Sequence, residues 1–161
     1  GFTSAPRDFD FDANGNIWAA VGDEVYVLRS DNSRDAITSF DSEVYAVRVY
    51  QGFLYVVVGN TVEMSHGLWR LPIQNDTLGD AESVVDALAA PWLEGESILT
   101  VEFAADGDIY FGTTHPSGVF VYHADGSTEP LYPRSSRRRH HQFRVGEWHP
   151  GLRHSEKPTR Q

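Results

Sequence analysis

The amino-acid sequence predicts an all-β fold made of about three four-stranded antiparallel sheets of the β-propeller blade type. A short motif recurs along the chain: "ANGNIWAAV" at 13–21 returns as "YQGFLYVVV" at 50–58 and as "ADGDIYFGT" at 105–113. Further short strands follow each copy, so that four strands recur roughly every 40 to 50 residues, a period typical of propeller blades. Together the motif and the period predict three repeats of one supersecondary unit.

The recurring motif predicts a turn followed by a buried strand. A turn glycine is followed two residues later by an aliphatic and then an aromatic residue, in the pairs Ile17-Trp18, Leu54-Tyr55 and Ile109-Tyr110. The strand that begins there is almost continuously apolar, which is typical of a strand buried on both faces. The preceding strand alternates instead, as in "VYAVRVY" at 44–50. We therefore expect the apolar strand to lie inside each sheet.

The three sheets are expected at about residues 8–40, 44–86 and 98–132. Their third strands carry central aromatic residues and are expected at "EVYVLRS" (24–30), "GLWRLPI" (67–73) and "GVFVYHADG" (118–126). Their fourth strands are expected at "AITSF" (36–40), "AESVVD" (81–86) and "STEPLY" (127–132). The stretch "SVVDALAAPWL" at 83–93 is expected to hold one helical turn, which Pro91 ends.

The stretch "DFDFDANGNIW" at 8–18 admits two interpretations. Asp10, Asp12 and Asn14, with Gly15, match the early positions of a calcium-binding loop, but its last position is Val21, which offers no oxygen ligand. Alternating acidic and aromatic residues instead predict a strand with one wet and one buried face. Asn14-Gly15 is then a tight hairpin turn, because both residues tolerate a positive φ. The strand and hairpin are the favoured interpretation.

Charge divides the chain into two regions. Residues 1–133 hold five basic and 21 acidic residues, a net of −16, whereas residues 134–161 hold eight basic and two acidic residues, a net of +6. The blade pattern stops where the basic tail begins, so we expect a disordered extension or a segment that is not native. A nucleic-acid-binding arm is the weaker alternative for this tail, and the acidic blades argue against polyanionic partners.

The stretches "PRDFDFDANGNIWAA", "HGLWRLPIQNDTLGDAE" and "VEFAADGDIYFGTTHPSGVFVYHADG" resemble blades of six-bladed propellers of the NHL and SMP-30/gluconolactonase type. Members of these groups depend on calcium or on a quinone. The resemblance covers residues 6–133 and implies a radial array of about six blades, of which three are present. We therefore expect a part of a larger propeller, completed by missing blades or by self-association, because an open arc exposes its apolar flanks.

The expected functional face is the one that carries the loops between second and third strands and the connections between blades. The residues on this rim that offer ligand-binding or acid-base chemistry are Glu43, Glu63, His66, Glu96 and His115. Each also has a plain structural explanation, since a solvated loop carboxylate is more common than a ligand. No catalytic motif of the resembling families matches residue by residue, so whether the protein is an enzyme stays open.

Two functions of different class follow. The first is a binding module that takes a small molecule or a protein on the loop face, because a propeller fold by itself implies no chemistry. The second is a metal-dependent hydrolase of the SMP-30/gluconolactonase type, in which a divalent cation such as calcium polarises an ester carbonyl. A quinone-dependent dehydrogenase is a weaker third.

Composition excludes several classes of chemistry. The sequence has no cysteine, which excludes disulfides, thiolate catalysis and cysteine-bound metal. No run approaches the roughly 20 apolar residues of a membrane-spanning helix. Composition does not identify the compartment, and an extracytoplasmic one is the expectation.

Overall fold

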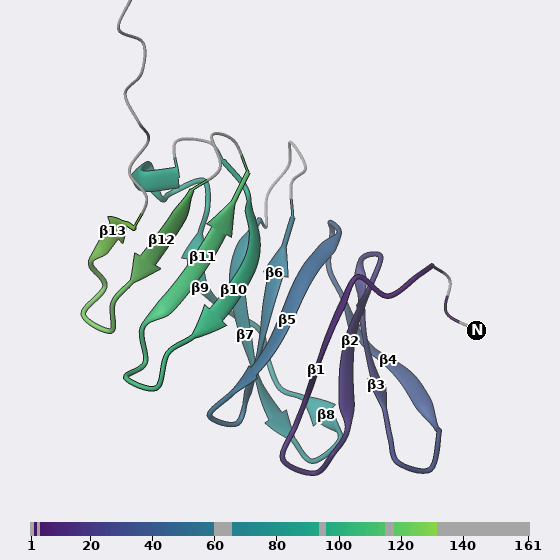
Figure 1. Cartoon of the computed structure of the whole chain (residues 1–161). Helices are drawn as coiled ribbons and strands as arrows, with labels where there is room; N and C mark the ends of the chain where they lie inside the picture. The colour runs from purple at the N-terminus through teal and green to yellow at the C-terminus, as the bar shows by residue number, and fades with distance from the viewer. Residues whose placement is uncertain (1, 3, 60–65, 94–95, 115–117, 132–161) are drawn as a thin grey trace, which may run out of the picture.

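The computed structural model describes residues 2, 4–59, 66–93, 96–114 and 118–131, which form three antiparallel sheets in a fan (Figure 1). The first sheet contains β1 (Asp8–Phe11), β2 (Ile17–Val21), β3 (Glu24–Leu28) and β4 (Arg34–Ser39) in that order. The third sheet contains β10 (Ile98–Phe103), β11 (Ile109–Thr113), β12 (Val119–Tyr122) and β13 (Thr128–Pro130), also in chain order. The predicted all-β class and the four-stranded units are confirmed.

The second sheet adds one short hairpin to the same plan. Its strands β5 (Val44–Tyr50), β6 (Phe53–Val58) and β7 (Gly67–Gln74) pair in order. The outer edge of β7 pairs with two strands, the two-residue β8 (Thr77–Leu78) at its far end and β9 (Glu82–Asp86) along its first half. The fourth strand therefore lies where "AESVVD" predicts it, and β8 was not predicted because a two-residue strand leaves no periodic signal.

The hairpin turns correct one prediction. The turns at 12–16, 29–33, 104–108 and 123–127 share one geometry, in which the fourth residue has a positive φ and donates its N–H to the carbonyl of the first. This is a type I turn with a bulge, in which only one residue needs the left-handed region. The two-residue turn expected at Asn14-Gly15 is therefore wrong, because Gly15 alone has a positive φ, of 82°. The turn of that kind is at Gln51-Gly52, where both φ values are positive.

The predicted helical turn is displaced. A 3₁₀ helix, η1 (Pro91–Leu93), begins at Pro91 instead of ending there. Proline suits the first position of a helix, because its φ is preset and that position needs no N–H donor. No helix among the described residues is long and apolar enough to cross a membrane.

Two hydrophobic cores hold the three sheets together. The core between the first and second sheets is formed by Trp18, Ala20, Val25, Val27, Val44, Val47, Leu54, Val56, Val58 and Leu71. The core between the second and third sheets is formed by Ala46, Tyr55, Val57, Leu68, Val85, Ala87, Ala90, Leu93, Ile98, Val101, Ile109 and Phe111. Each core draws on the facing sides of two neighbouring sheets, so the second sheet is covered on both faces, as the apolar strand β6 predicts.

The recurring aliphatic-aromatic pair divides its side chains between these cores. Leu54 lies in the core shared with the first sheet, and Tyr55 lies in the core shared with the third. Successive side chains of a strand point to opposite faces, so the aliphatic residue faces the preceding sheet and the aromatic residue the following one. Trp18 and Ile109 obey the same rule. The residues of the repeated motif thus take part in the packing between neighbouring sheets.

Candidate functional site

Antiparallel pairing sorts the connections onto two opposite edges of the fan. The hairpin turns of β1–β2, β3–β4, β5–β6, β10–β11 and β12–β13 lie along the lower edge in Figure 1, called the turn edge here. The connections after β2 and β4 lie along the upper edge, called the loop edge, and β6, β9 and β11 end at the same edge. The loop edge is the face on which the sequence places Glu43, Glu63, His66, Glu96 and His115.

Backbone contacts fasten the connections between sheets to the loop edge. The Gly59 N–H donates to the Glu43 carbonyl at 2.7 Å, and the buried Ser42 hydroxyl donates to the Gly59 carbonyl at 2.7 Å. In the third sheet the Thr114 N–H donates to the Ser97 carbonyl at 2.9 Å, and the Ser97 N–H returns a bond to the Thr114 hydroxyl at 3.0 Å. Each connection is therefore held to the end of the second strand of the sheet that it enters, which is β6 or β11.

The structure describes three of the five predicted rim residues. Glu43 is exposed and pairs with Arg7 at 2.9 Å, whereas Glu96 is 7% exposed and accepts a hydrogen bond from the Thr113 hydroxyl at 3.1 Å. His66 lies just before β7, and its Nδ1 atom is buried without a hydrogen-bond partner among the described residues. Glu63 and His115 lie outside the described residues.

Among the described residues, the exposed charged side chains of the loop edge are mainly acidic. Asp23, Asp41, Glu43 and Asp86 are all exposed there. Arg7 is the cation that contacts this group, through its pair with Glu43. An edge with this balance attracts cations and repels polyanions.

Of the candidate calcium ligands Asp10, Asp12 and Asn14, the two carboxylates have protein partners. The Asp12 carboxylate accepts the N–H groups of Asn14 and Asn16, the Asn16 side-chain amide and the Trp18 indole N–H, at 2.9 to 3.1 Å. The Asp10 carboxylate accepts the N–H of Val49 in the second sheet at 2.8 Å. Across the described part of the chain, no group of three or more His, Cys, Asp or Glu side chains is placed to hold a metal ion. Calcium binding here stays a prediction.

The pKa of Asp12 lies below its ordinary value. Partial burial raises this pKa, but the hydrogen bonds from Asn16, Trp18 and the backbone N–H groups lower it by more. A carboxyl whose folded pKa is depressed contributes stability above its unfolded pKa, about 3.9, and loses that contribution as the pH falls through the folded pKa. The hairpin should therefore weaken in acid below about pH 4.

Replacing Asp12 with asparagine should cost about 1–3 kcal/mol of unfolding free energy at pH 7, because the amide places N–H donors against those of Asn16 and Trp18. Urea unfolding at pH 7 and at pH 3 measures the change, which should shrink in acid. Asp125→Asn is the matched control, since the Asp125 carboxylate accepts hydrogen bonds from Ser127 and lies at an exposed turn. Equal losses in both variants would contradict the role of Asp12.

A charged cluster on the innermost strands was not predicted. Arg48 in β5 contacts the Asp8 carboxylate in β1 at 2.6 Å and the Glu102 carboxylate in β10 at 2.9 Å, so one side chain links all three sheets. Burial lowers the pKa of Arg48, but its bonds to both carboxylates raise it above the ordinary value. Strand register places Asp10, Arg48 and Glu102 at equivalent positions, opposite Trp18, Tyr55 and Tyr110. The charged residue that recurs at this position of each innermost strand was the sequence signal that could have predicted the cluster.

The sequence matches no family model and no curated protein. The fold is similar to a crystal structure of virginiamycin B lyase from Staphylococcus aureus, with a TM-score of 0.53 and 11% identity. That similarity covers 79% of this chain and 41% of the lyase chain. The chain has a partial β-propeller-like fold.

A second solved structure, the extracellular domain of a putative one-component system from B. thetaiotaomicron, has a TM-score of 0.42 and 16% identity. The match covers 80% of this chain and 22% of that one. At these identities the likeness concerns the fold alone, and this propeller-like chain spans less than half the length of either structure.

Proposed function

We propose that this propeller-like chain is a binding module whose loop edge takes a ligand or a protein partner carrying cationic groups. The observation that supports the proposal is the contrast between the two edges. The turn edge consists mainly of five-residue turns of one repeated geometry, whereas the connections of the loop edge differ in length, with two residues after β2 and four after β4. Exposed carboxylates lie on both edges, and those of the loop edge lie in these varied connections. Binding sites commonly lie on loops that a rigid scaffold positions.

The charge of the loop edge supports one class of partner. Asp23, Asp41 and Glu43 lie in connections at the loop edge and are exposed. Their carboxylates favour a partner with ammonium or guanidinium groups, which would be steered to this edge and bound less tightly at high salt. The net charge of −16 over residues 1–133 adds a long-range attraction for the same cationic partners.

The test uses a lysine octapeptide as the probe and isothermal titration calorimetry as the measurement. The triple variant Asp23→Asn, Asp41→Asn, Glu43→Gln should weaken binding by about fivefold or more, since each lost contact of this kind is worth a few tenths to 1 kcal/mol. The matched control is Asp31→Asn, Asp106→Asn, Asp125→Asn, which removes the same charge from exposed residues of the turn edge. Equal weakening by both sets would mean non-specific attraction and would contradict the proposal.

A metal-dependent hydrolase of the SMP-30/gluconolactonase type is the second candidate. It is favoured by Glu96, a buried carboxylate at the loop edge two residues before the innermost strand β10. A carboxylate in such a position is a suitable oxygen ligand for a divalent cation. Titration with calcium and with zinc separates the two functions: binding that Glu96→Gln abolishes favours the hydrolase, and its absence favours the binding module.

A further inference from the structure

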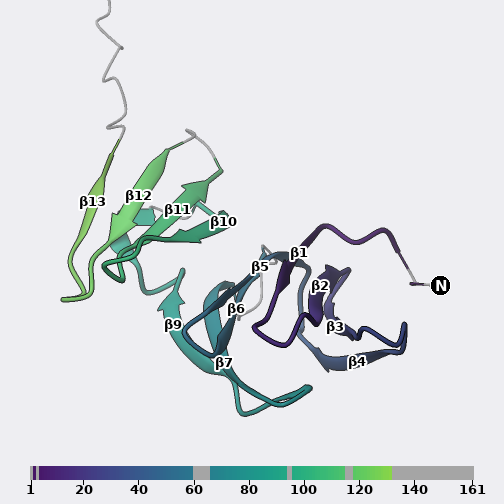
Figure 2. The same ribbon diagram turned by 60° about the horizontal axis from the view of Figure 1, so that its bottom comes forward.

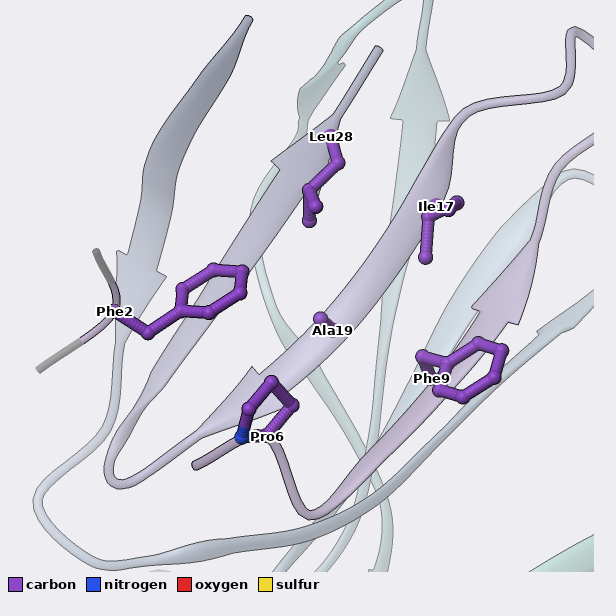
Figure 3. A pocket seen from close by; sticks show the side chains of 6 residues that line it. All are labelled: Phe2, Pro6, Phe9, Ile17, Ala19 and Leu28. Atoms are coloured by element: carbon purple, nitrogen blue, oxygen red, sulfur yellow. The ribbon is translucent and has the colours of Figure 1, made fainter. Parts of the chain in front are cut away.

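The outer face of the first sheet, which faces away from the second sheet, carries an apolar hollow of about 200 Å³. Figure 3 shows the side chains that line it, and all are apolar. They are Phe2, Pro6, Phe9, Ile17, Ala19 and Leu28. Phe9 and its neighbour Phe11 are each 55% exposed, which is unusual for two large aromatic side chains on one strand.

Strand register identifies the equivalent positions in the other two sheets. The pair Phe9–Ala19 of the first sheet is equivalent to Val47–Val56 of the second. It is also equivalent to Val101–Phe111 of the third. Ile17 pairs with Leu28 as Leu54 pairs with Leu71 and as Ile109 pairs with Tyr122. In the second and third sheets these positions pack in the cores shared with the preceding sheet. The hollow is thus the first sheet's copy of a surface that the chain covers twice.

One aromatic side chain of the preceding sheet is among the residues that cover each of the two copies. Trp18 of the first sheet lies in the same core as Val47, Leu54 and Val56 of the second. Tyr55 of the second sheet lies in the same core as Val101, Ile109 and Phe111 of the third. Trp18 is completely buried and Tyr55 is 8% exposed. Both are the aromatic members of the recurring pair, and both point to the sheet that follows.

The third member of the series is Tyr110. It pairs with Glu102 as Trp18 pairs with Asp10 and as Tyr55 pairs with Arg48, so it lies on the face of the third sheet that is turned away from the second. Tyr110 is partly exposed, whereas Val121, its pairing partner in β12, is 2% exposed. Figure 2 shows that this third sheet and the first sheet are the two ends of the fan. One end of the fan therefore carries the hollow, and the other carries the residue equivalent to Trp18 and Tyr55, which pack against such surfaces.

We infer that a second copy of this chain docks head to tail, with its Tyr110 in the hollow of the first sheet. The contact repeats the two junctions that the chain already makes between its own sheets. It is heterologous, because the hollow and Tyr110 lie on different surfaces of one molecule, so copies add in one direction until a ring closes or a filament grows. Burial of an aromatic side chain against an apolar surface drives the association.

Polar groups at the inner edge support the same register. In the first junction the carboxylates of Asp8 and Asp10 accept the N–H groups of Val47 and Val49 at 3.1 and 2.8 Å. Thr100 and Glu102 hold the positions of Asp8 and Asp10 in the third sheet, and Phe9 and Phe11 hold those of Val47 and Val49 in the first. The head-to-tail contact therefore brings an oxygen acceptor to the Phe9 N–H at the inner edge of β1, while the Phe11 N–H already donates to the Asp10 carboxylate at 2.8 Å.

The test measures solution mass of the full chain by light scattering over a range of concentrations. The wild type should rise above the monomer mass of 18.0 kDa as the concentration increases. Phe9→Glu, which spoils the hollow, and Tyr110→Ser, which removes the plug, should each shift the association to at least tenfold higher concentration. Leu88→Glu is the matched control, because Leu88 is a 66% exposed apolar residue away from both surfaces. Circular dichroism confirms that each variant is folded.

Mixing the two variants makes the test specific for a heterologous contact. Phe9→Glu keeps its Tyr110 and Tyr110→Ser keeps its hollow, so an equal mixture should form one heterodimer that grows no further, which native mass spectrometry resolves from either homodimer. A monomer at every concentration would overturn the inference. Association that neither variant weakens, or a mixture without the heterodimer, would overturn it as well.

Discussion

Replacing Trp18 with alanine should lower the free energy of unfolding by about 3–5 kcal/mol, the usual cost of deleting a buried large aromatic side chain. Trp18 is completely buried in the core between the first and second sheets, and its indole N–H donates to the Asp12 carboxylate at 3.1 Å. The substitution removes the side chain that interlocks two sheets and one of the donors that lower the pKa of Asp12. Urea unfolding followed by circular dichroism measures the loss.

The control for Trp18 is Phe9→Ala. Phe9 is an aromatic residue on the opposite face of the same sheet and is 55% exposed, so its truncation in the monomer should cost less than about 1 kcal/mol. Unfolding at a concentration below any self-association keeps the two effects apart. A loss at Trp18 no larger than that at Phe9 would contradict the interlocking role of the recurring aromatic residue.

Replacing Gly67 with alanine should cost about 3 kcal/mol or more, since strain and overpacking act together at this position. Gly67 opens β7 with a φ of 149°, and a Cβ atom there would overlap the Val85 carbonyl oxygen. That oxygen belongs to the backbone of β9, which pairs with β7, so relief requires the two strands to separate. Urea unfolding should show the loss, and hydrogen exchange should show faster exchange of the β9 amides.

Gly15→Ala separates conformational strain from collision. Gly15 has a φ of 82°, but a Cβ atom there has nothing within 4 Å, so only the left-handed conformation is penalised. We expect a cost of about 1–2 kcal/mol, with no change in the exchange of distant strands. If Gly15→Ala costs as much as Gly67→Ala, the collision with Val85 is not the cause.

Local pattern was sufficient to locate the strands. β2, β5 and β11 begin and end where the sequence predicts, because each is bounded by a turn residue and has a clear apolar period. The type of turn was harder to predict from the sequence. Asn14-Gly15 satisfies the usual signal of a two-residue turn, yet the Asp12 carboxylate bonds to the N–H groups of Asn14 and Asn16, and the hairpin has the longer, bulged form. A side chain that caps the backbone competes with the dipeptide preference.

The candidate site was predicted only in part. The sequence order of strands and loops was enough to place Glu43, His66 and Glu96 on one edge, since antiparallel pairing alternates the ends of successive strands. It did not reveal that Glu43 pairs with Arg7 or that Glu96 is buried beside Thr113. Those partners lie 36 and 17 residues away, and no local pattern specifies a contact over such distances.

The division between local and tertiary information has a physical basis. Alternation and turn chemistry act between neighbours in the chain, so residue order alone was enough to establish the four-stranded units and the aliphatic-aromatic pair within each. Which sheet each member of the pair faces depends on how whole sheets stack, and only the fold shows that Trp18 and Tyr55 pack in the cores shared with the next sheet. The same holds for Arg48, whose partners Asp8 and Glu102 reach it because the innermost strands of three sheets converge.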